Sequence, residues 1–388
     1  MSLENSQVEV QPLPLAEEGS AKPAHPRVRE TEFRDYAQIT ALESRYGLHP
    51  KRREEWTDLW VHNPVYRQIS HWPLGWVCED GDHQIIGSVA NIPLAYEFEG
   101  RTLIAATSRA LVMDSPYRAY SFSLLSRFFN QKNVDLFINT TVNAKAEKLQ
   151  EAFRAVHVPA GAWDRSAFWI TNYRAFTASL LARKGIPGAT VLSYPLSAAL
   201  FVRDTLNKAL WEQGDRIDIE FCSQFDCRFD VFFDLLRKSY PHRLLASRSS
   251  AFLDWHFKHA FSANRVWVLT VGRGQELLAY AILCRQDNPE LGLERMRLVD
   301  FQTMPGREAL LRPMLLRALK RCQDEGTHML EAIGFSFEKQ RLIESMSPHY
   351  RELASWRYFY KASDPDLAAS LKDPQAWDPT CFDGDSSL

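Results

Sequence analysis

One order of strand and helix signals occurs twice along this chain of 388 residues. In the first half, two strands joined at Asp80-Gly81 precede a long strand, a helix and a short apolar strand. The second half repeats this order around Gly272-Arg273-Gly274, so that 85–89 aligns with 277–281 and 111–112 aligns with 298–299. A duplicated α/β module explains the repetition, and chance agreement between two generic α+β patterns is the alternative.

Hydrophobic spacing predicts the elements of each half. In the first half we expect helices at 30–42 and 52–60, a hairpin at 75–79 and 84–92, a strand at 102–113, a helix after Pro116, a strand at 134–139, a helix at 144–156 and a strand at 167–170. In the second half we expect helices at 229–239 and 250–259, a hairpin at 266–271 and 276–284, a strand at 297–303, a helix at 308–324, a strand at 329–334, a helix at 337–346 and a last strand at 356–360.

These elements divide the chain into five segments. Residues 1–26 are polar, acidic and proline-rich, which predicts a disordered tail, and they lack the apolar stretch of a signal peptide. The first domain is expected at 27–175 and the second at 216–363. Between them, 176–215 is expected to be a connector with turns at Gly185 to Gly188 and one helix at 196–211. The polar stretch 364–388 predicts a loosely packed tail.

Composition excludes several classes of function. The chain carries 46 basic and 48 acidic residues with no dense basic block, so we expect no DNA partner. Its longest apolar run, near 194–202, is too short to span a bilayer, so we expect no membrane insertion. The six cysteines form no CxxC pair, which favours reduced thiols in a cytoplasmic protein and no bound metal.

The segment 110–125 has the strongest chemical signal. A strand, a tight connection and a helix start follow one another there, and a helix start offers free backbone N–H groups and a partial positive charge to a pyrophosphate. An ordinary strand-to-helix turn with a serine cap is the alternative. The residues expected to contact a donor in this segment are Val112, Arg118, Ala119, Tyr120, Ser121, Phe122 and Ser123.

This segment resembles the acyl-CoA loop of GNAT (Gcn5-related N-acyltransferase) enzymes. Pro116, Tyr117 and Arg118 match the entry of the family pattern, whereas Ser121 and Ser123 stand at its two glycine positions. The resemblance implies that acetyl-CoA or another acyl-CoA is the co-substrate. The two serines leave open an altered binding geometry, a different donor or no donor, because a Cβ atom restricts the approach of the backbone.

The next strand extends the resemblance. The family's donor lies in a V-shaped gap beside this strand, which implies contacts from Asn139, Thr140 and Asn143, with Asn143 opening the following helix. The run from Asn143 through Ala146 to Ala152-Phe153 resembles the family signature that closes the donor site, with Ala152 in place of glycine. A polar bulge followed by a helix cap is the alternative explanation of these polar residues.

The corresponding loop of the second half departs further from the family pattern. The stretch 303–308 has one glycine and places Glu308 at the helix start, where a carboxylate repels a phosphate. The expected fold class is therefore α/β with mixed sheets, in two tandem GNAT-like domains of which the second is degenerate. We expect that half to have a structural or acceptor-binding role.

Acyl transfer to an amine needs a base for the amine and an acid for the leaving thiolate. Asp114 and Tyr120 are the candidates nearest the loop, and the tyrosine that the family places on the helix after the gap is missing, since Leu149 or Gln150 takes its position. Ser108, Arg109, Glu97 and Glu99 remain further possibilities. The many tryptophans are expected in cores, with sugar stacking as the alternative.

The leading functional hypothesis is a bacterial N-acyltransferase that moves an acyl group, with acetyl expected, from acyl-CoA to a small-molecule amine between the halves. A broad similarity to GNAT-like proteins of surface polysaccharide pathways implies an amino sugar or a related precursor as acceptor. One alternative is a FemABX-like transferase that uses aminoacyl-tRNA or an acyl-carrier protein as donor. A second alternative is a non-catalytic binding protein. The oligomeric state stays open.

Overall fold

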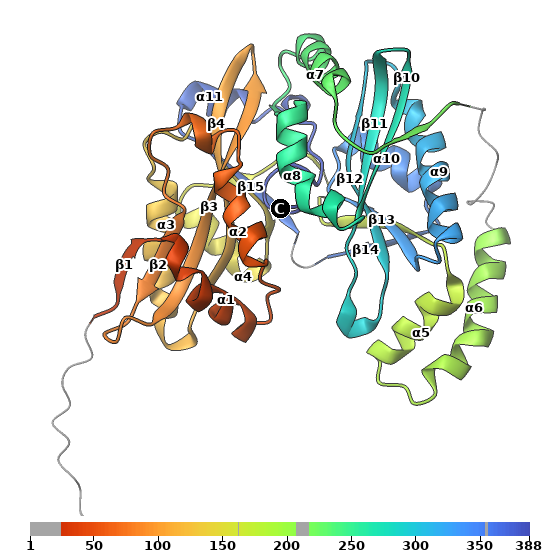
Figure 1. Cartoon of the computed structure of the whole chain (residues 1–388), viewed down its shortest axis with the longest axis horizontal. Helices are drawn as coiled ribbons and strands as arrows, with labels where there is room; N and C mark the ends of the chain where they lie inside the picture. Colours follow the sequence, from red (N-terminus) through yellow and green to blue (C-terminus); the bar gives the residue numbers. More distant parts are fainter. Residues whose placement is uncertain (1–24, 162, 207–216, 354–355) are drawn as a thin grey trace, which may run out of the picture.

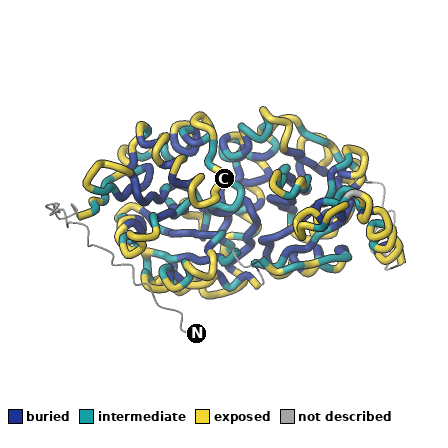
Figure 2. The backbone as a smooth tube through the Cα atoms, turned by 90° about the horizontal axis from the view of Figure 1, so that it is seen from below, coloured by how far each residue is buried: buried dark blue, intermediate teal, exposed yellow. Residues whose placement is uncertain are grey.

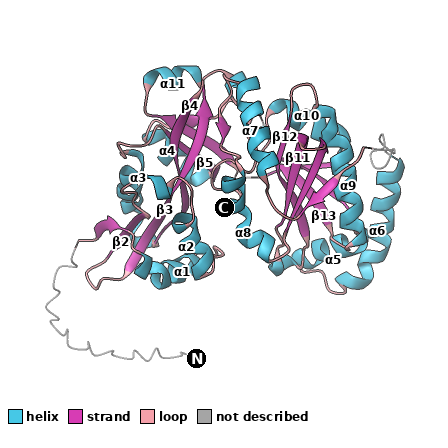
Figure 3. Ribbon diagram, turned by 45° about the horizontal axis from the view of Figure 1, so that its top comes forward, coloured by secondary structure: helices cyan, strands magenta, loops and turns pink. Residues whose placement is uncertain are grey.

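Two mixed β-sheets with helices packed around them form the two halves of the molecule (Figures 1 and 3). The computed structural model describes residues 25–161, 163–206, 217–353 and 356–388. The first sheet has the strand order β1-β2-β3-β4-β5-β15-β6, with β9 added beside β3, and the second has the order β14-β7-β13-β12-β11-β10-β8. In each sheet one parallel pair lies among antiparallel neighbours: β4 with β5, and β12 with β13. The predicted mixed α/β class is confirmed.

The first sheet and its helices come mostly from residues before 160. Its strands are β1 (Arg27–Glu30), β2 (Gly75–Glu79), β3 (Ile85–Phe98), β4 (Arg101–Met113), β5 (Leu136–Val142), β6 (Val156–His157), β9 (Leu245–Ala246) and β15 (Arg357–Ala362). Its helices are α1 (Tyr36–Arg45), α2 (Arg53–Val61), α3 (Ser121–Phe129) and α4 (Ala144–Ala152). The predicted hairpin and long strand are confirmed. Helix α4 ends four residues earlier than expected, because Arg154 has a positive φ of 61° and Val156 begins β6.

The second sheet repeats this arrangement. Its strands are β7 (Arg165–Ile170), β8 (Glu220–Cys222), β10 (Val266–Arg273), β11 (Glu276–Arg285), β12 (Arg295–Thr303), β13 (Met329–Ile333) and β14 (His349–Glu352). Its helices are α7 (Cys227–Ser239), α8 (Ser250–Ser262), α9 (Leu311–Asp324) and α10 (Phe337–Met346). Helix α9 starts later than predicted, because 308–310 form a separate 3₁₀ turn.

The two halves exchange their last strands. β7 follows the first half in sequence but lies in the second sheet, where Trp169 pairs with Leu330 of β13. β15 follows the second half but lies in the first sheet, where Tyr360 pairs with Ile138 of β5. Both strands were expected in their own halves. An apolar strand signal does not specify which sheet edge it joins, so this exchange is decided by tertiary packing.

The connector differs from the single helix expected at 196–211. It forms a hairpin of two helices, α5 (Tyr173–Arg183) and α6 (Ala189–Leu206), and 207–211 lie outside the described residues. Figure 1 shows this hairpin at the edge of the second half, away from the body of both sheets. The expected N-terminal tail also lies outside the described residues up to position 24, and β1 begins at Arg27.

The C-terminal segment 364–388 is packed, so the expectation of a loose tail is wrong. After α11 (Pro365–Ser370), the segment runs between the halves, and the chain ends in the middle of Figure 1. Leu371, Thr380 and Cys381 are fully buried. Two buried ion pairs hold the segment: Arg248 with Asp383 at 3.3 Å, and Lys339 with Asp378 at 2.8 Å.

Candidate functional site

A gap opens between the two central strands of the first sheet. β4 and β5 pair in parallel as far as Thr107 and Ile138, and beyond this point β4 pairs only with β3, up to Met113. Asn139 fixes the point of divergence: its Oδ1 accepts from the backbone N–H (3.0 Å) and Oγ (2.6 Å) of Ser108, and its Nδ2 donates to Gln150 at 2.9 Å. The Asn139 amide, predicted to contact a donor, therefore joins β4 to α4 at the start of the gap.

The free edge of β4 is irregular and reachable. Residues 108–111 are half-exposed, in contrast to the buried residues 105–107 that precede them. Ala110 has a φ of +53°, and the register with β3 shifts there, so two residues of β4 oppose Val89. Bulges of this kind re-aim side chains and interrupt pairing beside functional sites. The edge offers backbone amide groups to a ligand that enters the gap.

The predicted phosphate loop lies at the end of β4. A 3₁₀ turn, Ser115–Tyr120, leads directly into α3, and the first turn of α3 contains no acidic residue. Asp114, a predicted catalytic residue, takes hydrogen bonds from Arg45 Nη1 (3.0 Å) and Tyr46 Oη (3.0 Å), and the same Tyr46 oxygen accepts from the backbone N–H of Ser115. Asp114 thus ties the end of α1 to the loop.

The predicted donor residues around the loop have different surroundings. Tyr120, Phe122 and Ser123 line an open cavity of about 810 Å³ between α3 and β2, together with Trp72 and Trp76. The exposed ring of Phe122 stacks on Phe153 at 4.6 Å, which joins the first turn of α3 to the end of α4. Arg118 and Ala119 are exposed in the loop itself, Ser121 begins α3, and Val112 is buried in β4 before the loop.

Of the predicted donor residues on β5 and at the start of α4, Thr140 contacts the C-terminal segment. Asp385 Oδ1 accepts from the backbone N–H (2.9 Å) and Oγ1 (2.7 Å) of Thr140, and Thr141 Oγ1 donates to Asp385 Oδ2. Asn143 caps α4 by accepting from the backbone N–H groups of Lys145 and Ala146, so its predicted place at the helix start is confirmed. No local pattern predicts that Asp385, 245 positions further along the chain, occupies the Thr140 edge of β5.

The equivalent gap in the second half is closed. β12 and β13 pair up to Leu298 and Ala332, and beyond them the Phe382 N–H donates to the Val299 carbonyl (3.1 Å). Every residue of β12 from Met296 onward is buried. At the nearby helix start, Glu308 accepts from the Gly306 N–H at 3.3 Å. The chain itself therefore fills the position that stays reachable in the first half.

A second cavity, of about 200 Å³, lies between the halves. Lys51, Glu55 and Asp58 line it from the first half, and residues of α8 and the last two residues of the chain line it from the other side. Within it, His256 Nε2 lies 2.8 Å from Ser387 Oγ. Burial lowers the pKa of His256 to about 3, so its imidazole is neutral at pH 7.

Glu43 is the carboxylate that sequence analysis missed, and the charge of Lys51, which lines this cavity, acts on it. It lies on α1, is only 3% exposed, and burial raises its pKa, although Arg109 on the free edge of β4 and Lys51 oppose that rise. Burial and the charge of Arg109 lower the pKa of Lys51 to about 8. The available signal was helical spacing, because Glu43 lies four residues after the buried Ile39, on the apolar side of its helix.

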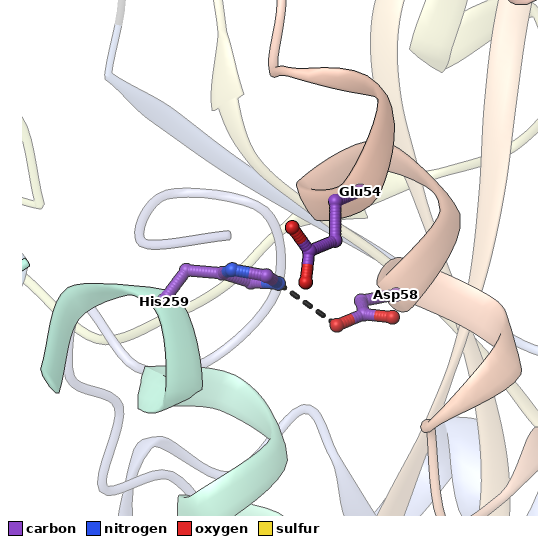
Figure 4. A group of neighbouring side chains, drawn as sticks. All are labelled: Glu54, Asp58 and His259. Atoms are coloured by element: carbon purple, nitrogen blue, oxygen red, sulfur yellow. Dashed lines mark hydrogen bonds and ion pairs between the residues drawn. The ribbon is translucent and has the colours of Figure 1, made fainter. Parts of the chain in front are cut away.

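Two groups of carboxylates and histidines could be considered for a metal ion. Figure 4 shows the first, in which Glu54, Asp58 and His259 approach one another across α2 and α8. Asp58 already accepts from Lys258 Nζ at 2.7 Å, and His259 Nε2 (2.9 Å) and His62 Nδ1 (2.6 Å) lie against it. The second group is Glu147, Glu151 and His157, where Arg357 pairs with Glu147. In each group a basic side chain pairs with one of the carboxylates, which is typical of ion-pair networks.

Comparison with known proteins establishes the fold. No protein-family model and no curated protein matches this sequence. Saccharomyces cerevisiae N-myristoyltransferase with bound myristoyl-CoA and inhibitors superposes with a TM-score of 0.55 and 11% identity, over 92% of this chain and 86% of that one. A GCN5-related N-acetyltransferase from Anabaena variabilis superposes with a TM-score of 0.51 and 10% identity, over 88% of this chain and 73% of that one. A probable N-acyltransferase from Enterococcus faecalis superposes with a TM-score of 0.52 and 11% identity, over 87% of this chain and 72% of that one. This chain therefore has the mixed α/β fold shared by GNAT proteins and N-myristoyltransferase.

Proposed function

We propose that this protein is an N-acyltransferase that binds acyl-CoA in the first half and passes the acyl group to an amine held between the halves. The observation that carries the proposal is the reachable edge of β4 beyond Thr107, next to an acid-free helix start, while the equivalent gap of the second half is filled. The two halves thus differ in the feature that a donor site requires.

The first half has the groups that a pantetheine and a pyrophosphate need. The backbone of β4 from Arg109 to Leu111 can exchange hydrogen bonds with an amide-rich chain, since β5 has diverged from it. The start of α3 offers N–H groups and a partial positive charge, with Arg118 exposed nearby. Ser121 and Ser123 replace the small residues of the family loop and can donate hydroxyl groups to phosphate.

Glu43 is our candidate for the general base. A carboxyl whose pKa is raised by burial accepts a proton from an ammonium group better than an ordinary carboxylate does. In the proposed step, the amine nitrogen attacks the thioester carbonyl, the C–N bond forms, the C–S bond breaks, and Glu43 receives the amine proton. Tyr120 stays a candidate acid for the thiolate. The ion-paired Asp114 fits an anchoring role better than a catalytic one.

The acceptor in this proposal occupies the cavity of about 200 Å³ between α2 and α8. Its walls carry both signs of charge, from Lys51, Arg52, Glu55 and Arg265. A polar amine such as an amino sugar or a related precursor suits such walls, and acetyl is our first choice of acyl group.

Ligand-induced stabilisation tests the donor site. Calorimetric titration and thermal shift with CoA, acetyl-CoA and a longer acyl-CoA should show binding to the wild-type protein, because a ligand that binds only the folded state stabilises it by about 2.7 kcal/mol at a hundredfold excess over Kd. Ser121→Glu places a negative charge at the start of α3 and should abolish the effect. Gln323→Glu adds the same charge on an exposed position of α9 and should not.

Turnover is then measured as free thiol released from acyl-CoA in the presence of a panel of amines. Glu43→Gln should lower that rate while leaving CoA binding intact. Absence of binding by every CoA species at millimolar concentration would remove the acyl-CoA proposal, and it would favour an aminoacyl-tRNA or carrier-protein donor.

A further inference from the structure

In the α5–α6 hairpin, helix α6 buries polar side chains and exposes large apolar ones. On the side of α6 turned toward the protein, Ser193 and Asp204 are fully buried, and Ser197 and Leu200 are half-buried. Val191 and Leu206 on the other side are 72% and 75% exposed. At 100° per residue, Val191, Val202 and Leu206 lie within about 60° of one another around the helix axis. Figure 2 shows the helix beside the grey segment at the right edge largely in the colour of exposed residues.

Specific contacts explain why the polar side faces inward. Tyr173 Oη donates to Asp204 at 3.0 Å, and His349 Nε2 of β14 lies 2.8 Å from the same carboxylate. Thr177 Oγ1 donates to the Ser193 carbonyl at 3.3 Å. These contacts fix the rotation of α6 about its axis, so the apolar side cannot turn toward the core. The large exposed apolar residues of α6 are Val191, Leu192, Tyr194, Leu196, Phe201, Val202 and Leu206.

An exposed apolar face of this length marks an interaction surface, because each exposed aliphatic side chain costs solvation free energy. The charges around this face indicate what kind of partner it contacts. Residues 173–206 contain four basic residues, Arg174, Arg183, Lys184 and Arg203, and one acidic residue, the buried Asp204. The hairpin is therefore positive within a chain whose net charge is −2.

We propose that the α5–α6 hairpin docks this protein on the surface of an anionic lipid membrane. Apolar side chains enter the boundary between headgroups and acyl chains, and the flanking basic residues lie at the anionic headgroups. Arg174 stacks over the Tyr194 ring at 4.4 Å, which places a cation and an amphipathic ring together at one end of the face. A second copy of the chain is a poorer occupant, since a two-fold interface would bring two positive hairpins together.

The hairpin has the features of a surface helix and lacks those of a spanning one. Among the helices of the described ranges, none combines the length and the apolar character that crossing a bilayer requires. Pro195 lies within α6 and has no N–H for the Val191 carbonyl. Such a carbonyl needs water or headgroup partners, which are present at the membrane surface and absent from its hydrocarbon core.

Sedimentation with lipid vesicles tests this proposal independently of acyl transfer. Wild-type protein should bind phosphatidylcholine–phosphatidylglycerol vesicles, and should bind phosphatidylcholine vesicles more weakly. Val202→Ser with Leu206→Ser should lower the partition coefficient at least about tenfold. The control, Val231→Ser with Leu235→Ser, removes exposed apolar side chains from α7 instead and should change it less than about twofold. Arg183→Gln with Lys184→Gln should reduce binding to the anionic vesicles only.

Failure of the wild-type protein to bind either vesicle overturns the proposal, as does equal binding by the α6 variant and the α7 control. Light scattering distinguishes the remaining occupant. If the wild-type protein is a dimer that does not bind vesicles, and Val202→Ser with Leu206→Ser dissociates this dimer, the face belongs to a second copy of the chain and the lipid surface is excluded. Coincident thermal melts of all variants should confirm that these exposed substitutions leave the fold intact.

Discussion

Removal of the Arg248 guanidinium should release the C-terminal segment from the interface between the halves. Arg248 is 1% exposed and donates to Asp300 (2.9 and 3.3 Å), to Asp383 (3.3 Å), to Thr380 Oγ1 (3.1 Å) and to the Ala246 carbonyl (2.9 Å). Arg248→Met fills a similar volume but leaves two buried carboxylates without a counter-charge. Loss of one partner from a buried ion pair costs about 3–5 kcal/mol, and this is the expected decrease in unfolding free energy.

The pH dependence of the variant follows from the same geometry. Burial already raises the pKa of Asp383 to about 6, and loss of Arg248, whose charge lowers that pKa, should raise it further. A carboxyl with a raised folded-state pKa is most favourable when protonated, so the variant should lose stability as pH rises, by at most about 1.4 kcal/mol per pH unit for each carboxylate. The deficit relative to wild type should therefore be smaller at pH 5 than at pH 8.

Urea denaturation of wild type, Arg248→Met, Asp300→Asn and the double variant measures these free energies. The double variant carries one buried carboxylate fewer, so its loss should be at least about 2 kcal/mol smaller than the sum of the single losses. Arg243→Met is the control, because Arg243 reaches Asp378 only at 4.0 Å and is partly exposed, so its loss should stay below about 1 kcal/mol. A cost below about 1 kcal/mol for Arg248→Met, or additive single losses, would refute the reasoning.

Three further predictions concern single residues. Glu43→Gln should lower acyl transfer about 10²–10⁴-fold with unchanged acyl-CoA affinity, measured by thiol release and calorimetry; an unchanged rate would exclude Glu43 as the base. The pKa of His256 falls from an ordinary 6.5 to about 3, so the folded state resists protonation of this imidazole and wild type loses stability as pH falls. The unfolding free energy of His256→Phe, measured by urea titration, should therefore rise relative to wild type by up to about 2 kcal/mol between pH 6.5 and pH 5. A difference that stays constant over this range would contradict the prediction. Gly384→Ala should lower the unfolding free energy more than Gly47→Ala, although both glycines have φ near +74°. A Cβ at 384 meets Thr140 Cγ2 at 2.6 Å, whereas a Cβ at 47 meets nothing within 4 Å. Equal losses in denaturation would show that the Thr140 side chain moves aside without cost.

Local pattern was enough to predict the mixed α/β class and most elements of both sheets. The alternation of strand and helix periods, the Asp80-Gly81 turn and the Asn143 cap are short-range signals, and each depends on contacts within a few residues. The phosphate loop could likewise be placed, since strand, turn and helix start are consecutive in the chain. Even the contrast between the two loops was visible, because Glu308 lies at the second helix start.

Tertiary structure alone decided how those elements combine. A strand pattern such as that of β7 or β15 specifies alternation and burial but not a neighbour, so their exchange between the sheets could not be derived from it. The C-terminal segment looks polar in sequence, but Trp377 and Phe382 are buried in it, and Arg248 and Lys339 neutralise its buried carboxylates. The same long-range packing placed Glu43 beside Arg109 and turned the apolar side of α6 to solvent. Short-range sterics and hydrogen bonding determined the local conformations, whereas the pairing of charges and strand edges far apart in the chain depended on the free energy of the whole fold.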